Sequence, residues 1–431
     1  MSKDYFPDFG DRSYDVTAYE LHLRYDVASN QLHGRTEIDA VAAVEVDELH
    51  LDLRGFRVTK VRCHPGHVAK FSVKRNKLVV RTKDVLGPGE RFSLSITYSG
   101  RPTPLPDGTD EMGWEELADG VLVAGQTNGA PSWFPCNDRP DNKASYRLHV
   151  TTSSDYHVVA NGQLVDRHRG ASATTWVYEQ PEPMATYLCT LQIGRYVEVE
   201  VPGAPVPLTA VLPPALRSRY DGAFGRQPEM LGFFSRIFGP YPFAGYTVVI
   251  TDDELEIPLE SQGLSVFGSN ALPDDWDNVR LVAHEMSHQW FGNSLTLTSW
   301  KDIWLHEGFA CYSEWLWSEE SGSRTAHERA LEHWGRLAEL PQDLAIGDPG
   351  PEDMFDDRVY KRGALLLHAL RLTVGDEKFF GLLASWVATH AYGSVTTAMF
   401  VEHAQEHAGR DVEDLFTAWL DGTDLPPLPD A

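Results

Sequence analysis

Cysteine is scarce in this sequence, and basic residues are outnumbered by acidic ones. The 431 residues include four cysteines, none in C-x-x-C spacing, so the sequence indicates neither a disulfide framework nor a cysteine-ligated zinc site. The 37 Lys and Arg against 63 Asp and Glu give a formal net charge of −26. A chain this acidic is a poor partner for nucleic acid or an anionic membrane surface. We therefore expect neither as a partner.

Long apolar runs are absent as well. No stretch approaches the roughly 18 apolar residues that a membrane-spanning helix requires. The first residues, MSKDYFPD, lack the apolar core of a signal peptide. We expect a cytoplasmic protein. A chain of 431 residues with 42% hydrophobic content exceeds one compact core, so we expect more than one domain.

The first part of the chain has the pattern of β-strands. Apolar and polar residues alternate over 20–27, 49–53 and 92–98, and L-G-P-G-E at 86–90 is typical of a turn. Helical periodicity is nearly absent there. We predict an all-β domain over residues 1–194, built as a saddle-like sandwich.

The second part, residues 195–431, is predicted to be mainly helical. Gly375, Gly409 and Gly422 lie where helices can end. The fold class is therefore α+β and multidomain, with a short strand expected at 246–251. The predicted helices span residues 227–238, 277–292, 302–320, 361–373, 377–390, 396–407 and 412–420.

Two histidines and a glutamate have the spacing of a zinc site. His284 and His288 lie four residues apart, so on a helix they share one face and can bind one metal ion. Asp277 is a credible N-cap for that helix and Gly292 a credible stop. Glu307, on the following helix, can supply a third ligand and leave the fourth position open for water. Such a site is hydrolytic.

The segment from His284 to Glu314 closely resembles the zinc aminopeptidases of the aminopeptidase N and leukotriene hydrolase family. That family shares H-E-x-x-H, then eighteen residues, then Glu within W-L-N-E-G-F-A; this chain has the same spacing, with His306 in place of the Asn. W-F-P-C-N-D-R-P at 133–140 and V-Y-K-R-G-A at 359–364 resemble two further family segments. The resemblance implies a gluzincin with a thermolysin-like catalytic domain.

The family assigns roles to the matching positions. His284, His288 and Glu307 would hold one Zn²⁺ per chain, and Glu285 would act as general base. Tyr360 would donate to the oxyanion of the tetrahedral intermediate. Without its flanking match, Tyr360 would be interpreted as an aromatic residue at a helix edge.

Recognition of the substrate's free amino group is implied by two further positions. In the family, the Glu of a G-x-M-E-N loop pairs with the α-ammonium, and Glu260 aligns with it. The loop departs from the pattern, with I-P-L-E-S at 257–261, and Pro258 lacks a backbone donor. Gln126 falls where relatives carry a second anchoring side chain, although an ordinary loop amide is the alternative. Glu314, seven residues after Glu307, is either a partner of a metal ligand or a surface carboxylate.

The sequence thus predicts a zinc-dependent aminopeptidase that releases N-terminal residues from peptides. Two alternatives stay open: a related zinc hydrolase, either an endopeptidase or an epoxide hydrolase, and an inactive zinc-binding homologue. The sequence leaves monomer and homodimer equally open.

The chain ends at Ala431, where the thermolysin-like domain of the family gives way to a C-terminal helical domain. We expect a short form of the family with an open cleft. Short peptides and chromogenic amino-acid amides should then be cleaved without a sharp length limit.

Overall fold

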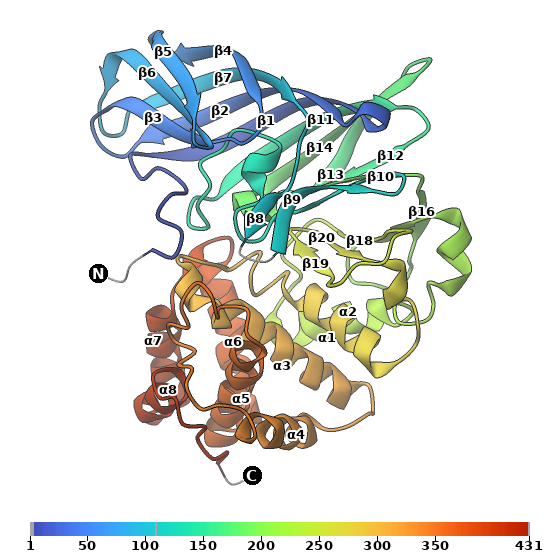
Figure 1. Ribbon diagram of the computed structural model, residues 1–431. Coiled ribbons are helices and arrows are strands. Elements are labelled where there is room, and N and C mark those ends of the chain that lie inside the picture. The colour runs from blue at the N-terminus through green and yellow to red at the C-terminus, as the bar shows by residue number, and fades with distance from the viewer. Residues whose placement is uncertain (1–3, 108–109, 430–431) are drawn as a thin grey trace.

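The computed structural model describes residues 4–107 and 110–429, and its β-rich half lies across a mainly helical half (Figure 1). The β-rich half contains the following strands: β1 (Tyr14–Asp26), β2 (Gln31–Ala42), β3 (Val46–Asp52), β4 (Arg57–His64), β5 (Val68–Lys74), β6 (Lys77–Leu86), β7 (Arg91–Gly100), β8 (Leu105–Asp107), β9 (Asp110–Leu117), β10 (Gly120–Ala124), β11 (Ala144–Ser153), β12 (His157–Ala160), β13 (Gln163–Arg169), β14 (Ala173–Met184) and β15 (Leu191–Gly194).

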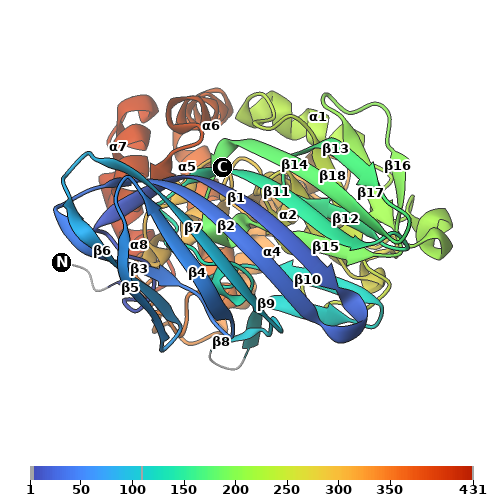
Figure 2. The ribbon, with the colours of Figure 1, turned by 90° about the horizontal axis from the view of Figure 1, so that it is seen from above.

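These strands form a large sheet and two smaller ones. The large sheet has the order β13-β14-β11-β1-β2-β7-β4, and its long strands run side by side in Figure 2. The smaller sheets have the orders β12-β15-β10-β9-β8 and β3-β6-β5. Along β1 and β2, buried and exposed residues alternate, because successive side chains of a strand point to opposite faces. This confirms the predicted N-terminal β domain.

The helical half begins with a small mixed sheet of order β16-β17-β18-β20-β19. Its strands are β16 (Val197–Glu200), β17 (Leu208–Leu212), β18 (Tyr246–Ile250), β19 (Leu259–Ser261) and β20 (Leu264–Phe267), and the short β21 (Thr296–Leu297) and β22 (Ser394–Val395) pair separately. The helices are α1 (Gln227–Phe238), α2 (Trp276–Ser287), α3 (Trp304–Glu320), α4 (Ala326–Ala338), α5 (Asp357–Val374), α6 (Asp376–His390), α7 (Thr397–Ala408) and α8 (Glu413–Leu420).

Seven of these helices match predicted ones, with two corrections to the helix of the zinc motif. Its N-cap is Asp275, whose side chain accepts from the backbone N–H of Asn278; Asp277 lies instead in the first turn. The regular helix ends at Ser287, and the chain then turns through Gly292, which has φ of 131°. The prediction also omitted α4.

Helix α3 is the buried centre of the helical half. Every residue from Trp304 to Ser318 is buried, so this helix has neighbours on all sides. It crosses α5 at Gly308 and Gly363, where a Cβ added to either glycine would lie 2.8–2.9 Å from the other's Cα. Only glycine permits this approach, which sets the position of α5 against α3.

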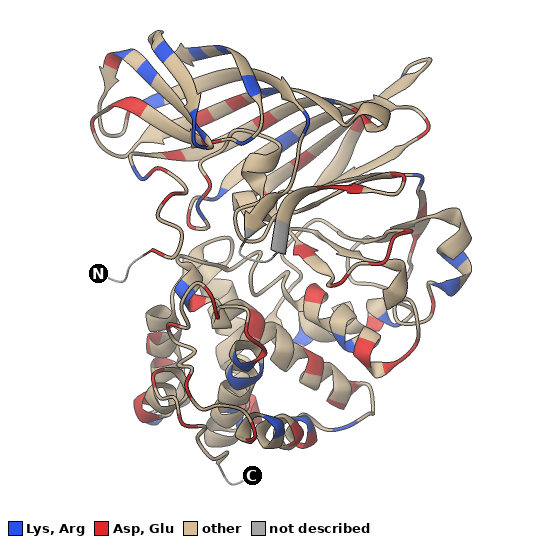
Figure 3. Cartoon of the chain, viewed as in Figure 1, with Lys and Arg blue, Asp and Glu red and all other residues tan. Residues whose placement is uncertain are grey.

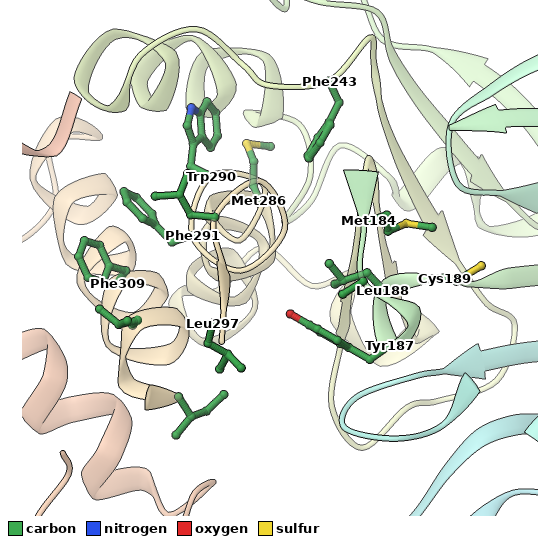
Figure 4. Packing of buried hydrophobic residues seen from close by; sticks show 14 of the residues in the cluster. Met184, Tyr187, Leu188, Cys189, Phe243, Met286, Trp290, Phe291, Leu297 and Phe309 are labelled. Carbon is green, nitrogen blue, oxygen red and sulfur yellow. The ribbon is translucent and has the colours of Figure 1, made fainter. Parts of the chain in front are cut away.

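The two halves meet at the segment that follows α2. Lys143, at the start of β11, donates from Nζ to the carbonyl oxygens of Asn293 and Ser294 at 3.0 and 2.8 Å. Tyr187 donates from its hydroxyl to the carbonyl of Gly292 at 3.2 Å (Figure 4). The β half therefore holds the backbone immediately after the zinc motif.

Among the described residues, no helix has both the length and the apolar character needed to cross a membrane. All four cysteines are buried and free.

Candidate active site

His284, His288 and Glu307 come together in the buried centre of the helical half. His284 Nε2 and His288 Nε2 lie 3.3 and 3.6 Å from Glu307 Oε2. One ligand atom from each of the three lies within 4.8 Å of the other two. His288 follows the last helical residue of α2 but keeps helical dihedral angles, and its N–H still bonds to the His284 carbonyl. The two rings therefore retain the spacing of one helix face.

The far nitrogen of each histidine ring is already held. His284 Nδ1 lies 2.8 Å from Glu314 Oε1, and His288 Nδ1 lies 2.9 Å from the Phe291 carbonyl oxygen. Both partners are acceptors, so each Nδ1 carries a proton and each Nε2 is the ring atom that faces Glu307 and can bind a metal. Histidine ligands of metals are usually oriented in this way.

The charges of the cluster suit a bound cation. Burial opposes charge on His288, yet the nearby Glu307 carboxylate raises the pKa of the ring to about 10. Burial likewise opposes charge on His284, but hydrogen bonds to Glu307 and Glu314 raise its pKa to about 9. In return, the histidines hold the pKa of Glu307 well below its usual range despite its burial. Two imidazole nitrogens and one carboxylate are a donor set that fits zinc with an open position.

Glu285 and Tyr360 border this cluster. Burial raises the pKa of the Glu285 carboxyl, and Glu307 reinforces the effect while the two histidines oppose it. The Tyr360 ring, in the first turn of α5, stacks on the His284 ring with centroids 6.0 Å apart. Burial raises the pKa of the Tyr360 hydroxyl well above its usual value, so it remains a proton donor.

The crossing of α3 and α5 explains why Tyr360 reaches the cluster. Glu307 directly precedes Gly308, and Tyr360 lies three residues before Gly363, one turn along α5. Because the two backbones touch at these glycines, the side chains just before them converge.

Glu260 and Gln126 meet at one end of the cluster, although 134 positions separate them. Gln126, in the loop after β10, donates from Nε2 to Glu260 Oε1 at 2.7 Å. Oxygens of Glu260 and Glu285 and a nitrogen of His288 lie within 4.8 Å of one another. Burial raises the pKa of Glu260 to about 7, against the pull of His288.

All seven predicted residues line one cleft of about 540 Å³. Glu314 is buried and hydrogen-bonded to His284. It is therefore a partner of a proposed metal ligand and not a surface carboxylate. Sequence reasoning missed Arg280, which also lines the cleft. Its spacing of four residues from His284 is the signal that could have found it.

Comparisons with known proteins agree with this geometry. The Peptidase M1 N-terminal domain matches residues 15–188, and the Peptidase family M1 domain matches residues 223–419. A leucyl aminopeptidase of Saccharolobus solfataricus is 26% identical over 94% of this chain and 53% of its own length. Aminopeptidase B of Rattus norvegicus is 25% identical over 97% of this chain and 71% of its own length. The chain spans about half the length of the first curated relatives it matches.

Solved structures match along the whole chain. The M1 zinc metallopeptidase of Deinococcus radiodurans is 31% identical, covers 99% of both chains and has a TM-score of 0.91. A variant from the same organism, bound to a Tyr-Ser-Ala substrate, is 30% identical over 99% of both chains with a TM-score of 0.89. In fold and in site, this chain is similar to the two-domain zinc metallopeptidases among the solved structures. Within that class, the chain belongs to the M1 family.

Proposed function

We propose that this protein is a zinc aminopeptidase that hydrolyses the N-terminal peptide bond of peptides. The observation that carries the proposal is the Gln126–Glu260 pair beside the metal-binding cluster, because a carboxylate at that position can bind a substrate's free α-ammonium. The names of the M1 relatives, leucyl aminopeptidase and aminopeptidase B, support the same activity.

In this proposal, His284, His288 and Glu307 hold one Zn²⁺. When bound, the ion supplies Lewis acidity toward the scissile carbonyl and lowers the pKa of the attacking water. The fixed Nδ1 partners of both histidines hold each ring with its Nε2 toward the position of the ion.

Glu285 and Tyr360 carry the proton chemistry. Glu285 takes a proton from the attacking water and returns it to the leaving amine, a role supported by its burial, which raises its pKa toward the working range of a general base. Tyr360 donates a hydrogen bond to the oxyanion from a hydroxyl that stays protonated.

Glu260 and Gln126 bind the substrate's amino terminus. The ammonium adds a charge-assisted hydrogen bond to Glu260, and the Gln126 side-chain oxygen is a second acceptor. Peptides with a free N-terminus are therefore the proposed substrates. We also propose a cytoplasmic location, supported by the free state of all four cysteines.

Glu260→Ala tests the exopeptidase assignment. With Leu-p-nitroanilide, the variant should lose about 100-fold or more in kcat/KM, since a buried charge partner is removed. N-acetyl-Leu-p-nitroanilide should be cleaved by neither the variant nor the parent protein. Glu256→Ala, which removes an exposed carboxylate four residues earlier, is the matched control and should change little.

Cleavage of acetylated and free substrates at equal rates would overturn the aminopeptidase proposal and favour an endopeptidase. Hydrolysis of an epoxide substrate without any peptidase activity would favour an epoxide hydrolase.

A further inference from the structure

Arg280 extends the line of functional side chains on α2. Arg280, His284 and His288 follow each other at intervals of four residues, so their side chains lie on one face of the helix. That face forms part of the cleft wall, and all three residues line the cleft. From residue 280 to residue 288 the helix axis advances about 12 Å.

The two ends of this line differ in charge. Glu260 lies next to His288, at the C-terminal end of α2, with ligand atoms within 4.8 Å. Arg280 lies beyond His284, toward the N-terminal end of α2, and Arg280 and His284 both contact Glu314. A peptide whose ammonium binds Glu260 therefore directs its leaving part toward Arg280.

Arg280 is also a loosely engaged and partly exposed cation of this part of the cleft. Its shortest contacts among the described residues are 3.4 and 3.5 Å to Glu314 and 3.8 Å to Asp277, a side chain that is 90% exposed. Its own side chain is 31% exposed. Most of its five N–H donors are thus free for a ligand.

The other cations that line the cleft either have closer partners or are buried. Arg329 lies over the Trp276 ring at 4.0 Å and donates to Ser318 Oγ at 3.1 Å. Arg336 donates to Glu332 Oε1 at 2.5 Å. Lys361 is buried, 3.4 Å from a cysteine sulfur and 3.6 Å from an Asp357 oxygen.

We propose that Arg280 binds the C-terminal carboxylate of short peptides on the leaving-group side of the scissile bond. The inference rests on the proposed aminopeptidase function and names its substrate class, namely free di- and tripeptides. Arginine binds carboxylates through paired N–H donors, so the contact is directional as well as electrostatic.

Peptide length agrees with this assignment. An extended chain spans at most about 3.3–3.6 Å per residue, so a dipeptide covers roughly 7 Å and a tripeptide roughly 10 Å. The tripeptide span is close to the roughly 12 Å between the Arg280 and His288 positions. A dipeptide falls about 5 Å short, a gap that an extended arginine side chain can bridge, whereas a pentapeptide of roughly 17 Å extends beyond it. A graded preference for short free peptides thus replaces the flat length dependence expected from the sequence.

The first experiment uses the zinc-loaded parent protein and measures kcat/KM for Leu-Gly and for Leu-Gly amide, which lacks the carboxylate. We expect a preference of about tenfold for the free dipeptide, because a hydrogen bond between charged groups is lost in the amide. Leu-Gly₄ and its amide should differ by less than about twofold. Equal rates for Leu-Gly and its amide would overturn the inference.

The second experiment compares the ratio of the two dipeptide rates in variants with equal zinc content. In Arg280→Met the free-to-amide ratio should fall to about one, while Arg280→Lys, which keeps the charge, should retain an intermediate ratio. Arg336→Met removes the same charge from a cation already paired with Glu332, and it should keep the parental ratio.

An unchanged ratio in Arg280→Met, or an equal loss in Arg336→Met, would contradict a specific role of Arg280. If Arg280→Met does not fold, the rates of the parent protein and of Arg280→Lys still test the proposed role of Arg280. Failure of the parent protein to cleave either dipeptide or its amide overturns the aminopeptidase proposal itself, and this inference with it.

Discussion

Single hydrogen bonds decide which atoms of the two histidines face the proposed metal. Flipping either ring would exchange Nδ1 with the Cδ2 carbon and leave an acceptor without its proton donor, Glu314 for His284 and the Phe291 carbonyl for His288. Both acceptors are buried, so the exchange would cost on the order of 1–3 kcal/mol for each ring. The site is therefore held in its ligating orientation before an ion arrives.

Glu285→Gln separates metal binding from proton transfer. The amide keeps the size of the side chain but cannot accept a proton from water, so kcat should fall by at least about 10²-fold. Zinc content should stay near one per chain, because Glu285 is not among the proposed ligands. Metal analysis together with steady-state kinetics checks both expectations, and loss of zinc in this variant would contradict the assignment of roles.

The positions of the proposed site residues could be predicted wherever they depend on spacing along one helix or on a family motif. His284 and His288 are examples, since four residues complete about one turn. Glu314 is different, because its contacts with His284 and Arg280 depend on how α2 packs against α3. Sequence periodicity carries no information about that packing.

At the scale of elements, α4 is the clearest omission from the sequence prediction. Thr325 and Glu328 form a capping box, so a start signal was present. The helix carries interspersed acidic and basic residues (Figure 3), and few of its residues are buried. Its apolar residues nevertheless recur at helical spacing, at Ala326, Ala330, Trp334 and Leu337, a pattern that the sequence prediction overlooked. The helix supplies one wall of the cleft.

The contact between α2 and α3 through Glu314 yields a prediction about metal affinity. Glu314→Gln should weaken zinc binding by about 10–100-fold, because a neutral amide polarises the His284 ring less than a carboxylate does. Glu320→Gln, which changes a more exposed carboxylate on the same helix, is the control. Competition with a chromogenic chelator measures both constants, and equal affinities would show that Glu314 does not act through His284.

We propose the domain boundary between residues 194 and 195. The last strand before it, β15, pairs with β10 and β12, whereas β16 pairs with β17 of the following sheet. No regular strand in the described residues joins the sheets on either side of this point.

At the scale of the whole molecule, the overall layout was predictable because helical periodicity is nearly absent from the first part of the chain and prevails in the last. The small sheet of β16 to β20 between them was predicted only at 246–251. The predicted β domain and helical domain are both confirmed. The interface between the two domains could not be predicted, because the Lys143 and Tyr187 hydrogen bonds join residues more than 100 positions apart.

Asp138, buried in the β half, should make the stability of the molecule depend on pH. Burial, reinforced by Asp52, raises its pKa to about 7. Between about pH 4 and 7 the folded state then holds a proton that the unfolded chain releases. The free energy of unfolding should fall as pH rises through this window, by at most about 1.4 kcal/mol per pH unit from this group.

Asp138→Asn removes the titration and should flatten that part of the profile. Urea unfolding at a series of pH values measures the slope for the variant and for its parent. Asp84→Asn, at an exposed position, is the control. Parallel profiles for Asp138→Asn and the parent would contradict the prediction.

The Gln126–Glu260 hydrogen bond joins the two halves, whereas the three proposed zinc ligands all belong to one of them. The β half also holds the backbone that follows the zinc motif, through Lys143 and Tyr187. Substrate anchoring and the geometry of the proposed zinc ligands therefore depend on the same junction between the halves. Selection that shifts this junction to tune the affinity for peptides also acts on the retention of the ion.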